Sequence, residues 1–600
     1  MMPSEALKHT QRLLSQGDTL GAIDSLEAII KADQQDQESL ELLCGLLLKS
    51  AQITKAQRYL SSLNPTEIKS ANLARMAGYI AIQFGDALRS IECYRLASEG
   101  LPANLEVQVE FVTALRIGGK FGWAKQQLQQ LLAVAPNNSL VLDEAGWLAL
   151  AQAKFKVAIQ AFTKSISTDG PTEQRLNGII RAYLEIDDLK NAGDLLLKAR
   201  QEFPNSTDLL HLEAVLLTKL KEFEAAYDCY QAILAATPDK RDSQLNLGVL
   251  AAKRGELDLA ESLFTRIIEL NPSDFEAWYQ LSTIDPANSH AGLVNLFEQH
   301  CAPFQSSARY WFVLAKLQHQ QANYSDSFAS TQRARELKMK EEGCGVSFPT
   351  HYQLNNFSLP NASANPSVIF VTGMPRSGTT LTQRILSQHE QCTAMGETGI
   401  IAKLISELKL DPNNPSECLS RLSPEQKQRT RDKLLKDLLP EPGVVAVEHT
   451  PINIFYIPLI AALLPEARFV ICERDRTDNC LSIYQQSLSR EYRFANSPGA
   501  LAQVWEHARE LSQLLSNGWS DRVHRVSYEQ LVTEPEQVIT NLLDSVGLPF
   551  DEACLHPQSG SQWIHSPNLR QARRAIHNES VNKLSRYGSA IHPFIAELSQ

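Results

Sequence analysis

A small residue recurs every 34 positions along the first half of this 600-residue chain. Prolines follow several of these residues by twelve positions, where a proline would end a helix, and glycines precede others by twelve, where two helices would cross closely. The shared period predicts a stack of similar two-helix units. The small residues are Ala22, Ala56, Ser90, Ala124, Ala158, Ala192, Ala226 and Ala260; the prolines are Pro102, Pro136, Pro204, Pro238 and Pro272; the glycines are Gly78, Gly146 and Gly248.

A period of 34 residues is typical of tetratricopeptide repeats. An aromatic residue or leucine often follows the small residue by four positions, which places both on one helix face. We therefore expect an α-solenoid of tetratricopeptide repeats over residues 1–341. Its concave groove would bind a peptide or protein. If another part of the chain is an enzyme, that peptide or protein could be its acceptor substrate. A scaffold without a ligand of its own is the simpler alternative. Residues 342–366 lose the helical period and contain several X-Pro pairs, which predicts a linker.

The pattern changes from Ser367 onward to short apolar runs that alternate with helical segments. This alternation predicts a three-layer α/β domain with a mostly parallel sheet over residues 367–600. In such folds ligands bind beyond the carboxyl ends of the strands, so residues directly after each run are candidates for the site. The expected strands are Val368–Thr372, Val444–Glu448, Arg468–Cys472 and Val523–Val526.

A glycine-bounded loop follows the first expected strand and opens a helix, as in P-loop proteins. Its spacing matches G-x-x-x-x-G-K-[ST], but Thr379 stands where an ATP- or GTP-binding loop has its lysine, and Arg376 brings the cation into the loop itself. This P-loop-like segment therefore favours a phosphate ligand other than a triphosphate. The candidate binding residues are Pro375, Arg376, Ser377, Gly378, Thr379 and Thr380.

Composition narrows the remaining classes. A net charge of −11 argues against a nucleic-acid-binding protein, because phosphate neutralisation needs a basic surface. Ten cysteines are scattered without a C-x-x-C pair, which argues against structural zinc and disulfides and indicates a reducing compartment. Without an apolar run long enough to span a bilayer or an apolar targeting segment, we expect a cytoplasmic protein with no membrane partner. A homo-oligomer is compatible with this sequence.

Four motifs in order resemble the sulfotransferases that use 3′-phosphoadenylyl sulfate (PAPS). They are P-R-S-G-T-T after a strand, G-E-T, R-D-x-x-x-x-x-L-S-I-Y, and V-S-Y-E-Q-L. The chain is most similar to protein-tyrosine sulfotransferases and to bacterial proteins that fuse such a domain to tetratricopeptide repeats. The resemblance covers about residues 367–600. It implies that the first loop binds the 5′-phosphosulfate, that Arg474 and Ser482 bind the 3′-phosphate, and that no metal is needed.

The resemblance also implies catalytic residues. Glu397 in the G-E-T motif would be the general base that removes the proton of the acceptor hydroxyl. Its position alone also suits a first-turn residue of a helix over Thr398–Leu408. Arg376 would stabilise the transferred group and the leaving phosphate. His449 stands where the family usually has a lysine, and its imidazolium would serve only when protonated, so activity would fall at alkaline pH. A buried structural histidine is the alternative.

Three further positions match more weakly. Tyr528 corresponds to a tyrosine that packs near the nucleotide, and Asn568 and Lys583 lie in the segment that matches a loop covering the donor, although the family tends to have serine at the Asn568 position. The implied function is transfer of a sulfuryl group from PAPS to a hydroxyl, with a protein or peptide tyrosine as the favoured acceptor. The alternatives are sulfation of a small-molecule or glycan hydroxyl, a magnesium-dependent phosphotransferase, and a repeat scaffold with an inactive nucleotide-binding domain.

Overall fold

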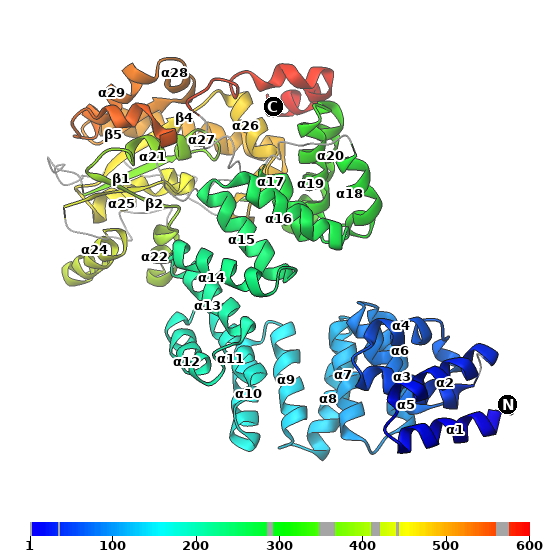
Figure 1. Ribbon diagram of the computed structural model, residues 1–600. Coiled ribbons are helices and arrows are strands. Elements are labelled where there is room, and N and C mark those ends of the chain that lie inside the picture. Colours follow the sequence, from blue (N-terminus) through cyan, green and yellow to red (C-terminus); the bar gives the residue numbers. More distant parts are fainter. Residues whose placement is uncertain are drawn as a thin grey trace. The chain divides into compact units, whose positions relative to one another are not determined.

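The computed structural model describes residues 3–33, 36–284, 292–346, 367–409, 421–439, 443–559 and 575–599. The chain forms two compact units, Met1–Ala236 and Thr237–Gln600 (Figure 1). No helix within the described ranges is long and apolar enough to cross a membrane.

The first unit consists of antiparallel helix pairs. Every residue of the 34-position series in this unit lies on the second helix of a pair and is fully buried, as predicted. The prolines of the series stand two residues after a helix end, also as predicted. The elements are α1 (Pro3–Ser15), α2 (Thr19–Ala32), α3 (Gln37–Lys49), α4 (Ile53–Leu60), η1 (Pro65–Glu67), α5 (Ala71–Gln83), α6 (Ala87–Gly100), α7 (Leu105–Ile117), α8 (Phe121–Val134), α9 (Ser139–Ala151), α10 (Phe155–Asp169), α11 (Glu173–Glu185), α12 (Leu189–Glu202), α13 (Thr207–Lys219) and α14 (Phe223–Ala236).

The glycines of the repeats lie where helices cross closely. A Cβ atom at Gly146 in α9 would come within 2.6 Å of the Phe162 ring in α10, and one at Gly78 would come within 2.7 Å of the Tyr94 ring. Since real Cβ contacts are longer, each glycine makes room for the aromatic residue that follows the small residue of the 34-position series by four positions. The predicted close crossings are confirmed.

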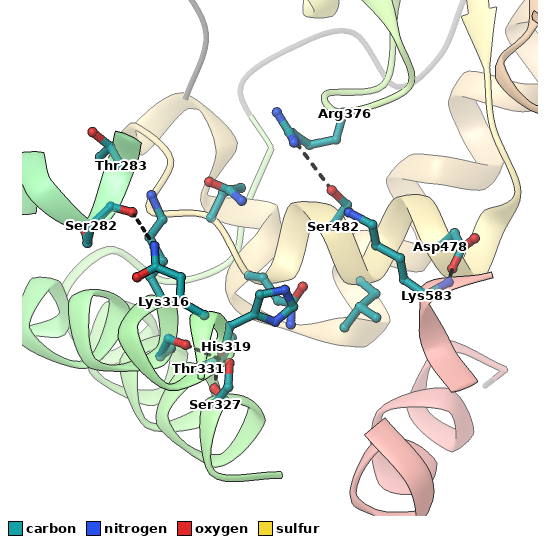
Figure 2. Close-up of a pocket in the computed structure, with 15 residues that line it drawn as sticks. Ser282, Thr283, Lys316, His319, Ser327, Thr331, Arg376, Asp478, Ser482 and Lys583 are labelled. Atoms are coloured by element: carbon teal, nitrogen blue, oxygen red, sulfur yellow. Dashed lines mark hydrogen bonds between the residues drawn. The ribbon is translucent and has the colours of Figure 1, made fainter. Parts of the chain in front are cut away.

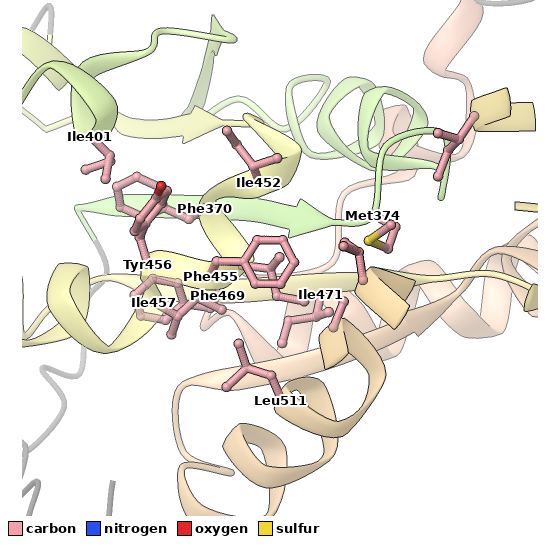
Figure 3. Packing of buried hydrophobic residues seen from close by; sticks show 14 of the residues in the cluster. Phe370, Met374, Ile401, Ile452, Phe455, Tyr456, Ile457, Phe469, Ile471 and Leu511 are labelled. Carbon is pink, nitrogen blue, oxygen red and sulfur yellow. The ribbon is translucent and has the colours of Figure 1, made fainter. Parts of the chain in front are cut away.

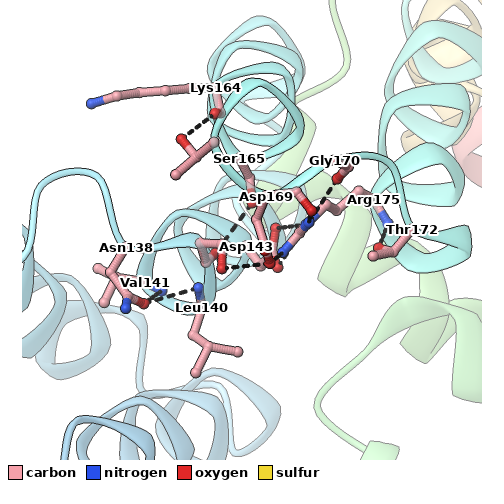
Figure 4. Close-up of polar contacts among 12 residues, drawn as sticks. Asn138, Leu140, Val141, Asp143, Lys164, Ser165, Asp169, Gly170, Thr172 and Arg175 are labelled. Atoms are coloured by element: carbon pink, nitrogen blue, oxygen red, sulfur yellow. Dashed lines mark hydrogen bonds and ion pairs between the residues drawn. The ribbon is translucent and has the colours of Figure 1, made fainter.

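Arg175 at the start of α11 ties three helices of the first unit together (Figure 4). Its Nε lies 3.0 Å from Asp143 Oδ1, its Nη2 lies 3.1 Å from Asp169 Oδ2, and its Nη1 donates to the carbonyl oxygen of Gly170 at 2.7 Å. The hydrogen bond to Asp143 is the main cause that raises the pKa of Arg175. This buried cation is thus neutralised by carboxylates of α9 and α10.

The second unit begins with the last repeats, and its α20 packs into the α/β domain. Arg335 of α20 is fully buried and donates from Nε to the carbonyl oxygen of Tyr484 at 2.8 Å, from Nη2 to that of Ile483 at 2.8 Å, and from Nη1 to Asn496 Oδ1 at 2.9 Å. Phe328 of the same helix belongs to the main core of the α/β domain. The repeat helices of this unit are α15 (Arg241–Arg254), α16 (Leu257–Leu270), α17 (Phe275–Ile284), α18 (Leu293–Cys301), η2 (Ala302–Phe304), α19 (Ala308–Gln320) and α20 (Tyr324–Glu342).

Within the described residues, the α/β domain has a five-stranded parallel sheet in the order β2-β3-β1-β4-β5. Its strands are β1 (Val368–Gly373), β2 (Cys392–Gly396), β3 (Val445–Glu448), β4 (Arg468–Glu473) and β5 (Val523–Ser527). The helices are α21 (Thr379–Leu386), α22 (Ile400–Leu408), α24 (Pro424–Leu438), η3 (Pro451–Tyr456), α25 (Ile457–Leu463), α26 (Arg476–Tyr484), η4 (Arg490–Asn496), α27 (Pro498–Gly518), α28 (Tyr528–Thr533), α29 (Pro535–Ser545), η5 (Glu552–Leu555), η6 (Pro557–Ser559), η7 (Lys583–Ile591) and α31 (His592–Leu598).

Side chains of each strand alternate between two cores, which makes the domain three-layered. Val368 and Phe370 of β1 pack with residues of α25 and α27 (Figure 3), whereas Ile369 and Val371 pack with residues of α21 and α29. Both faces are apolar because helices cover both, as expected of a parallel sheet.

The predicted fold class, an α-solenoid followed by a three-layer α/β domain, is confirmed. The four expected strands are present within one residue of their predicted bounds, but β2 was not predicted. The domain bounds 1–341, 342–366 and 367–600 stay a prediction. The two compact units instead divide the chain within the repeats, because α20 shares the core of the α/β domain.

Candidate active site

The candidate residues follow neighbouring strands at one edge of the sheet. β2 pairs with β3 so that Gly396 is opposite Glu448, which brings the following residues, Glu397 and His449, close together. β1 pairs with β4 so that Gly373 is opposite Cys472, which places the glycine loop beside Arg474. Parallel strands end at a common edge, so the four segments form one site.

The loop after β1 depends on its two glycines. Gly378 has φ 108° and is the N-cap of α21, and a Cβ atom there would lie 2.9 Å from the Tyr528 ring. Gly373 has φ 144°, and a Cβ atom there would collide with the carbonyl oxygen of Cys472. The turn is therefore closed to larger residues at both ends. Thr379 and Thr380 form the first turn of α21, whose free N–H groups face the loop.

Arg376 has a left-handed backbone, with φ 65°, which is strained for a residue with a long side chain. Two donors from the β4–α26 segment hold this conformation. Arg474 Nη1 donates to the carbonyl oxygen of Arg376 at 3.0 Å, and Asn479 Nδ2 donates to that of Pro375 at 2.9 Å. The motif around Arg474 thus shapes the phosphate loop as well as supplying a cation. Sequence reasoning missed Asn479, whose only signal is its place in that motif.

Cations gather beside this loop. Arg376 Nε donates to Ser482 Oγ at 3.3 Å. Burial, and then the nearby Arg474, lower the pKa of Arg376 to about 10; burial, and then Arg376 and Arg474, lower the pKa of Lys583 to about 8. Mutual repulsion of this kind would be relieved by a bound anion. The structure brings Arg376, Arg474, Ser482 and Lys583 together, as the sequence predicted.

The polar atoms at the loop fit phosphate groups. Ser377 Oγ and Arg474 Nε are buried and have no hydrogen-bond partner within the part of the chain that the structure describes. Such atoms are costly unless a ligand or water satisfies them. The Arg474 guanidinium lies 4.9 Å from the centre of the Tyr528 ring, which also covers Gly378. Asn568 lies outside the described residues.

Glu397, the predicted base, lies on the loop between β2 and α22. The helix α22 begins at Ile400 with Gly399 as its N-cap, so Glu397 precedes the helix and is not a first-turn residue. Its side chain is half exposed, and burial together with nearby Glu448 raises its pKa to about 7. His449 is buried, and its Nε2 lies 3.9 Å from Glu397 Oε1. This carboxyl group is therefore partly protonated at neutral pH and accessible to a substrate.

Glu448 is a functional candidate that sequence reasoning missed. This buried carboxylate ends β3 and accepts hydrogen bonds from Thr398 N at 3.2 Å, Thr398 Oγ1 at 3.1 Å, Thr450 N at 3.1 Å and Asn453 Nδ2 at 3.0 Å, and also from Thr450 Oγ1. Burial raises its pKa, and the donors oppose that shift. Because Thr398 follows Glu397, Glu448 anchors the loop that carries the candidate base.

Within the described residues, no group of three or more His, Cys, Asp or Glu side chains is arranged so that it could hold a metal ion.

Two regions of the chain match known protein families. Residues 366–552 match the sulfotransferase family, and residues 212–275 match a tetratricopeptide repeat. The chain combines tetratricopeptide repeats with a sulfotransferase domain. This domain is distantly related to protein-tyrosine sulfotransferases, which is the family that the sequence motifs indicated.

The related proteins are divergent. An uncharacterized protein of Aquifex aeolicus is 25% identical over 435 residues, covering 68% of this chain and 52% of that protein. A protein-tyrosine sulfotransferase of Drosophila melanogaster is 25% identical, covering 34% of this chain and 41% of its own length. Protein-tyrosine sulfotransferase 1 of Danio rerio is 24% identical, covering 32% and 55%. The chain thus spans about half the length of the curated relatives it matches.

Among solved structures, a tetratricopeptide repeat protein from Parabacteroides merdae matches with a TM-score of 0.36 and 15% identity. The match covers 41% of this chain and 97% of the solved one.

Proposed function

We propose that this chain transfers a sulfuryl group from PAPS to the hydroxyl of a tyrosine in a peptide or protein. The observation that carries the proposal is that Glu397, which follows β2, and the cations around Arg376, which follows β1, lie at the same edge of the sheet. The carboxyl has a pKa of about 7, and burial, followed by neighbouring Arg474, lowers the pKa of the Arg376 guanidinium to about 10. A base near neutrality beside a basic phosphate loop suits deprotonation of a hydroxyl next to an anionic donor.

The donor would span the loop and the start of α26. The N–H groups at the start of α21 and the Arg376 side chain would hold the 5′-phosphosulfate. Arg474, Ser482 and Lys583 would hold the 3′-phosphate, and Tyr528 lies against Arg474 at the same end. This donor has no γ-phosphate, which accounts for Thr379 at the position of the P-loop lysine.

The transfer step follows from the positions of the donor-binding residues and of Glu397. The acceptor oxygen attacks the sulfur atom, the bond between sulfur and the 5′-phosphate oxygen breaks, and the acceptor proton passes to the Glu397 carboxylate. The leaving phosphate keeps the electron pair of the broken bond, and Arg376 with the loop amides stabilises its charge. A carboxylate suffices for a phenol of pKa about 10, because the proton becomes more acidic as the new bond forms. A protonated His449 beside Glu397 would add a second cation.

A peptide or protein acceptor is supported by two observations. Curated relatives are named protein-tyrosine sulfotransferases. In addition, the repeats of the second unit form a pocket with Lys253, Tyr279 and Phe312 on its walls, and this pocket also contacts Gln486–Leu488 after α26. A surface of this kind accommodates an aromatic side chain and carboxylates of a peptide.

Calorimetric titration with adenosine 3′,5′-bisphosphate, run against ATP with magnesium, tests the donor. We expect the bisphosphate alone to bind tightly, and Arg474→Ala to abolish that binding. Arg266→Ala is the matched control, because Arg266 lies on α16 and its side chain is half exposed. Preference for ATP with magnesium would contradict the proposal and favour a phosphotransferase. Ser482→Ala, with a smaller side-chain change, repeats the test if Arg474→Ala does not fold.

Transfer of labelled sulfate from PAPS tests the acceptor. We expect a tyrosine-containing peptide to be sulfated with a higher kcat/KM than a small phenol or a glycan. Deletion of residues 1–236, at the boundary of the compact units, would raise KM for the peptide and leave the small phenol unchanged if the first unit presents the substrate. Equal effects on both acceptors would reject that role for the first unit. Better sulfation of the phenol or glycan than of the peptide would reject the peptide acceptor.

A further inference from the structure

A second set of polar residues lies across a pocket from the cations of the candidate active site (Figure 2). The pocket, of about 140 Å³, lies within the second compact unit. One wall comes from the α/β domain and includes Arg376, Ser482 and Lys583. The other comes from the last repeats and includes Lys316 and His319 of α19. The repeats thus contribute side chains to a pocket whose other wall carries residues of the sulfotransferase motifs.

The charge of the pocket suits an anion. Its described lining residues include the cations Arg376, Lys316 and Lys583, and one carboxylate, that of Asp478. That carboxylate accepts the backbone N–H groups of Asn582 at 2.5 Å and Lys583 at 3.0 Å. Asp478 therefore fixes the start of η7 and holds Lys583 at the pocket. The net charge of the three cations and this carboxylate is still positive.

His319 is oriented by a chain of hydrogen bonds. Gln485 Nε2 donates to the Tyr587 hydroxyl at 2.6 Å, and that hydroxyl lies 3.0 Å from His319 Nδ1. Burial, followed by nearby Lys583 and Arg586, lowers the pKa of His319 to about 4, so the ring is neutral at pH 7. When Tyr587 donates to Nδ1, the ring hydrogen is on Nε2. His319 then offers an N–H donor rather than a lone pair to a ligand.

We propose that Lys316 and His319 bind the 3′-phosphate of the donor nucleotide together with Ser482 and Lys583. The inference rests on the proposed function, since it assigns further binding residues to the same donor. It makes the last repeats part of the nucleotide site. The position of Lys316 and His319 opposite Ser482, a serine that accepts from Arg376, carries the assignment.

The test compares two nucleotides that differ by the 3′-phosphate. Calorimetric titration with adenosine 3′,5′-bisphosphate and with adenosine 5′-monophosphate is run on the full-length chain, on Lys316→Met and on His319→Phe. These changes keep most of the side-chain volume and remove the charge or the donor. Lys340→Met is the matched control, since Lys340 is exposed near the end of α20. Melting curves check that each variant is folded.

We expect Lys316→Met to weaken bisphosphate binding about tenfold or more, as loss of a charge-assisted hydrogen bond does. His319→Phe should weaken it about threefold to tenfold, as loss of a neutral hydrogen bond does. Monophosphate binding should change less than about twofold in both variants, and Lys340→Met should change neither nucleotide.

The outcomes separate this inference from the proposed function. If Arg474→Ala abolishes bisphosphate binding while Lys316→Met and His319→Phe retain it, the α19 residues do not bind the phosphate and the inference is wrong. Equal weakening of both nucleotides by Lys316→Met would also overturn it. If the unaltered chain binds neither nucleotide, the proposed donor is wrong, and the inference falls with it.

Discussion

Arg175 in the first compact unit and Arg376 in the second both lie within folded structure, but their surroundings are opposite in sign. Arg175 contacts Asp143 and Asp169, and the hydrogen bond to Asp143 raises its pKa. Arg376 donates to Ser482 and lies near Arg474 and Lys583; burial, and then Arg474, lower its pKa to about 10.

Under the proposed function, the difference is that between a structural cation, Arg175, and a binding cation, Arg376. A cation held by carboxylates gains little from an added anion, because its charge is already balanced. A cation held among other cations is destabilised by their repulsion, and an anionic ligand relieves that repulsion when it binds. Mutations of Arg175 and of Arg376 should therefore affect different measurements.

The largest expected effect is the loss of turnover in the variant Arg376→Gly. Turnover in the labelled-sulfate assay should fall about 10³-fold, because the variant loses charge stabilisation at the transferred group. The free energy of unfolding in urea should stay equal or rise by up to about 1 kcal/mol, because glycine adopts φ 65° without strain and a repelling charge is removed. A clear loss of stability with full turnover would show that Arg376 is structural and break the comparison.

A buried carboxylate provides the mirror case. Glu448→Gln replaces an acceptor of several hydrogen bonds with an amide that has one oxygen and two donor hydrogens. We expect the free energy of unfolding to fall by about 1 to 3 kcal/mol, because buried donors lose their partner. Turnover should fall at least tenfold, while binding of adenosine 3′,5′-bisphosphate is kept. Unchanged turnover would mean that the Glu397 loop does not depend on this anchor.

Arg175, which is paired with two carboxylates, should affect stability and not turnover, the opposite of Arg376. Arg175→Met should lower the free energy of unfolding in urea by about 2 kcal/mol, since Asp143 and Asp169 are partly exposed and regain water. Donor binding and turnover should not change. Arg95→Met is the control, because the exposed pair of Arg95 with Glu99 contributes no more than about 0.5 kcal/mol. A loss of donor affinity in Arg175→Met would contradict the division into structural and binding cations.

The last test changes the pH near neutrality instead of a residue. The base acts when deprotonated, so with a Glu397 pKa of about 7 the rate should rise about tenfold per pH unit below 7 and reach half its maximum near pH 7. Deprotonation of His449 should lower the rate again at alkaline pH. His449→Lys should move this alkaline limb to higher pH, because a lysine stays charged longer. An alkaline limb that does not move would assign it to another group.

Local patterns allowed much of this site to be predicted from sequence. The 34-residue period and the loop from Gly373 to Gly378 are sequence-local features, and each was found where it was expected. The strand-end arginine and the Ser482 helix were found in the same way. The sheet edge then brought together the segments that follow β1, β2, β3 and β4, as parallel strands require.

Features that depend on distant segments were not predicted. β2 is a short edge strand with a half-buried pattern and no apolar run, so its sequence lacks a strand signal. The role of Glu448 depends on Thr398, which is 50 residues away, and the place of His319 depends on Tyr587, which is 268 residues away. The start of α22 at Ile400 was missed for a local reason, because the left-handed turn at Gly399 delays the helix.

The buried contacts of Arg335 have a consequence for synthesis of the chain. Arg335 is made about 150 residues before the carbonyl groups of Ile483 and Tyr484 that accept its hydrogen bonds. At about 5 to 20 residues per second, a ribosome needs roughly 7 to 30 s to cover that distance. During this interval α20 has no α26 to pack against, and its apolar face and cation remain in water. The final repeat can therefore complete its fold only after the sulfotransferase domain is largely synthesised, whereas the repeats before it can fold as they emerge.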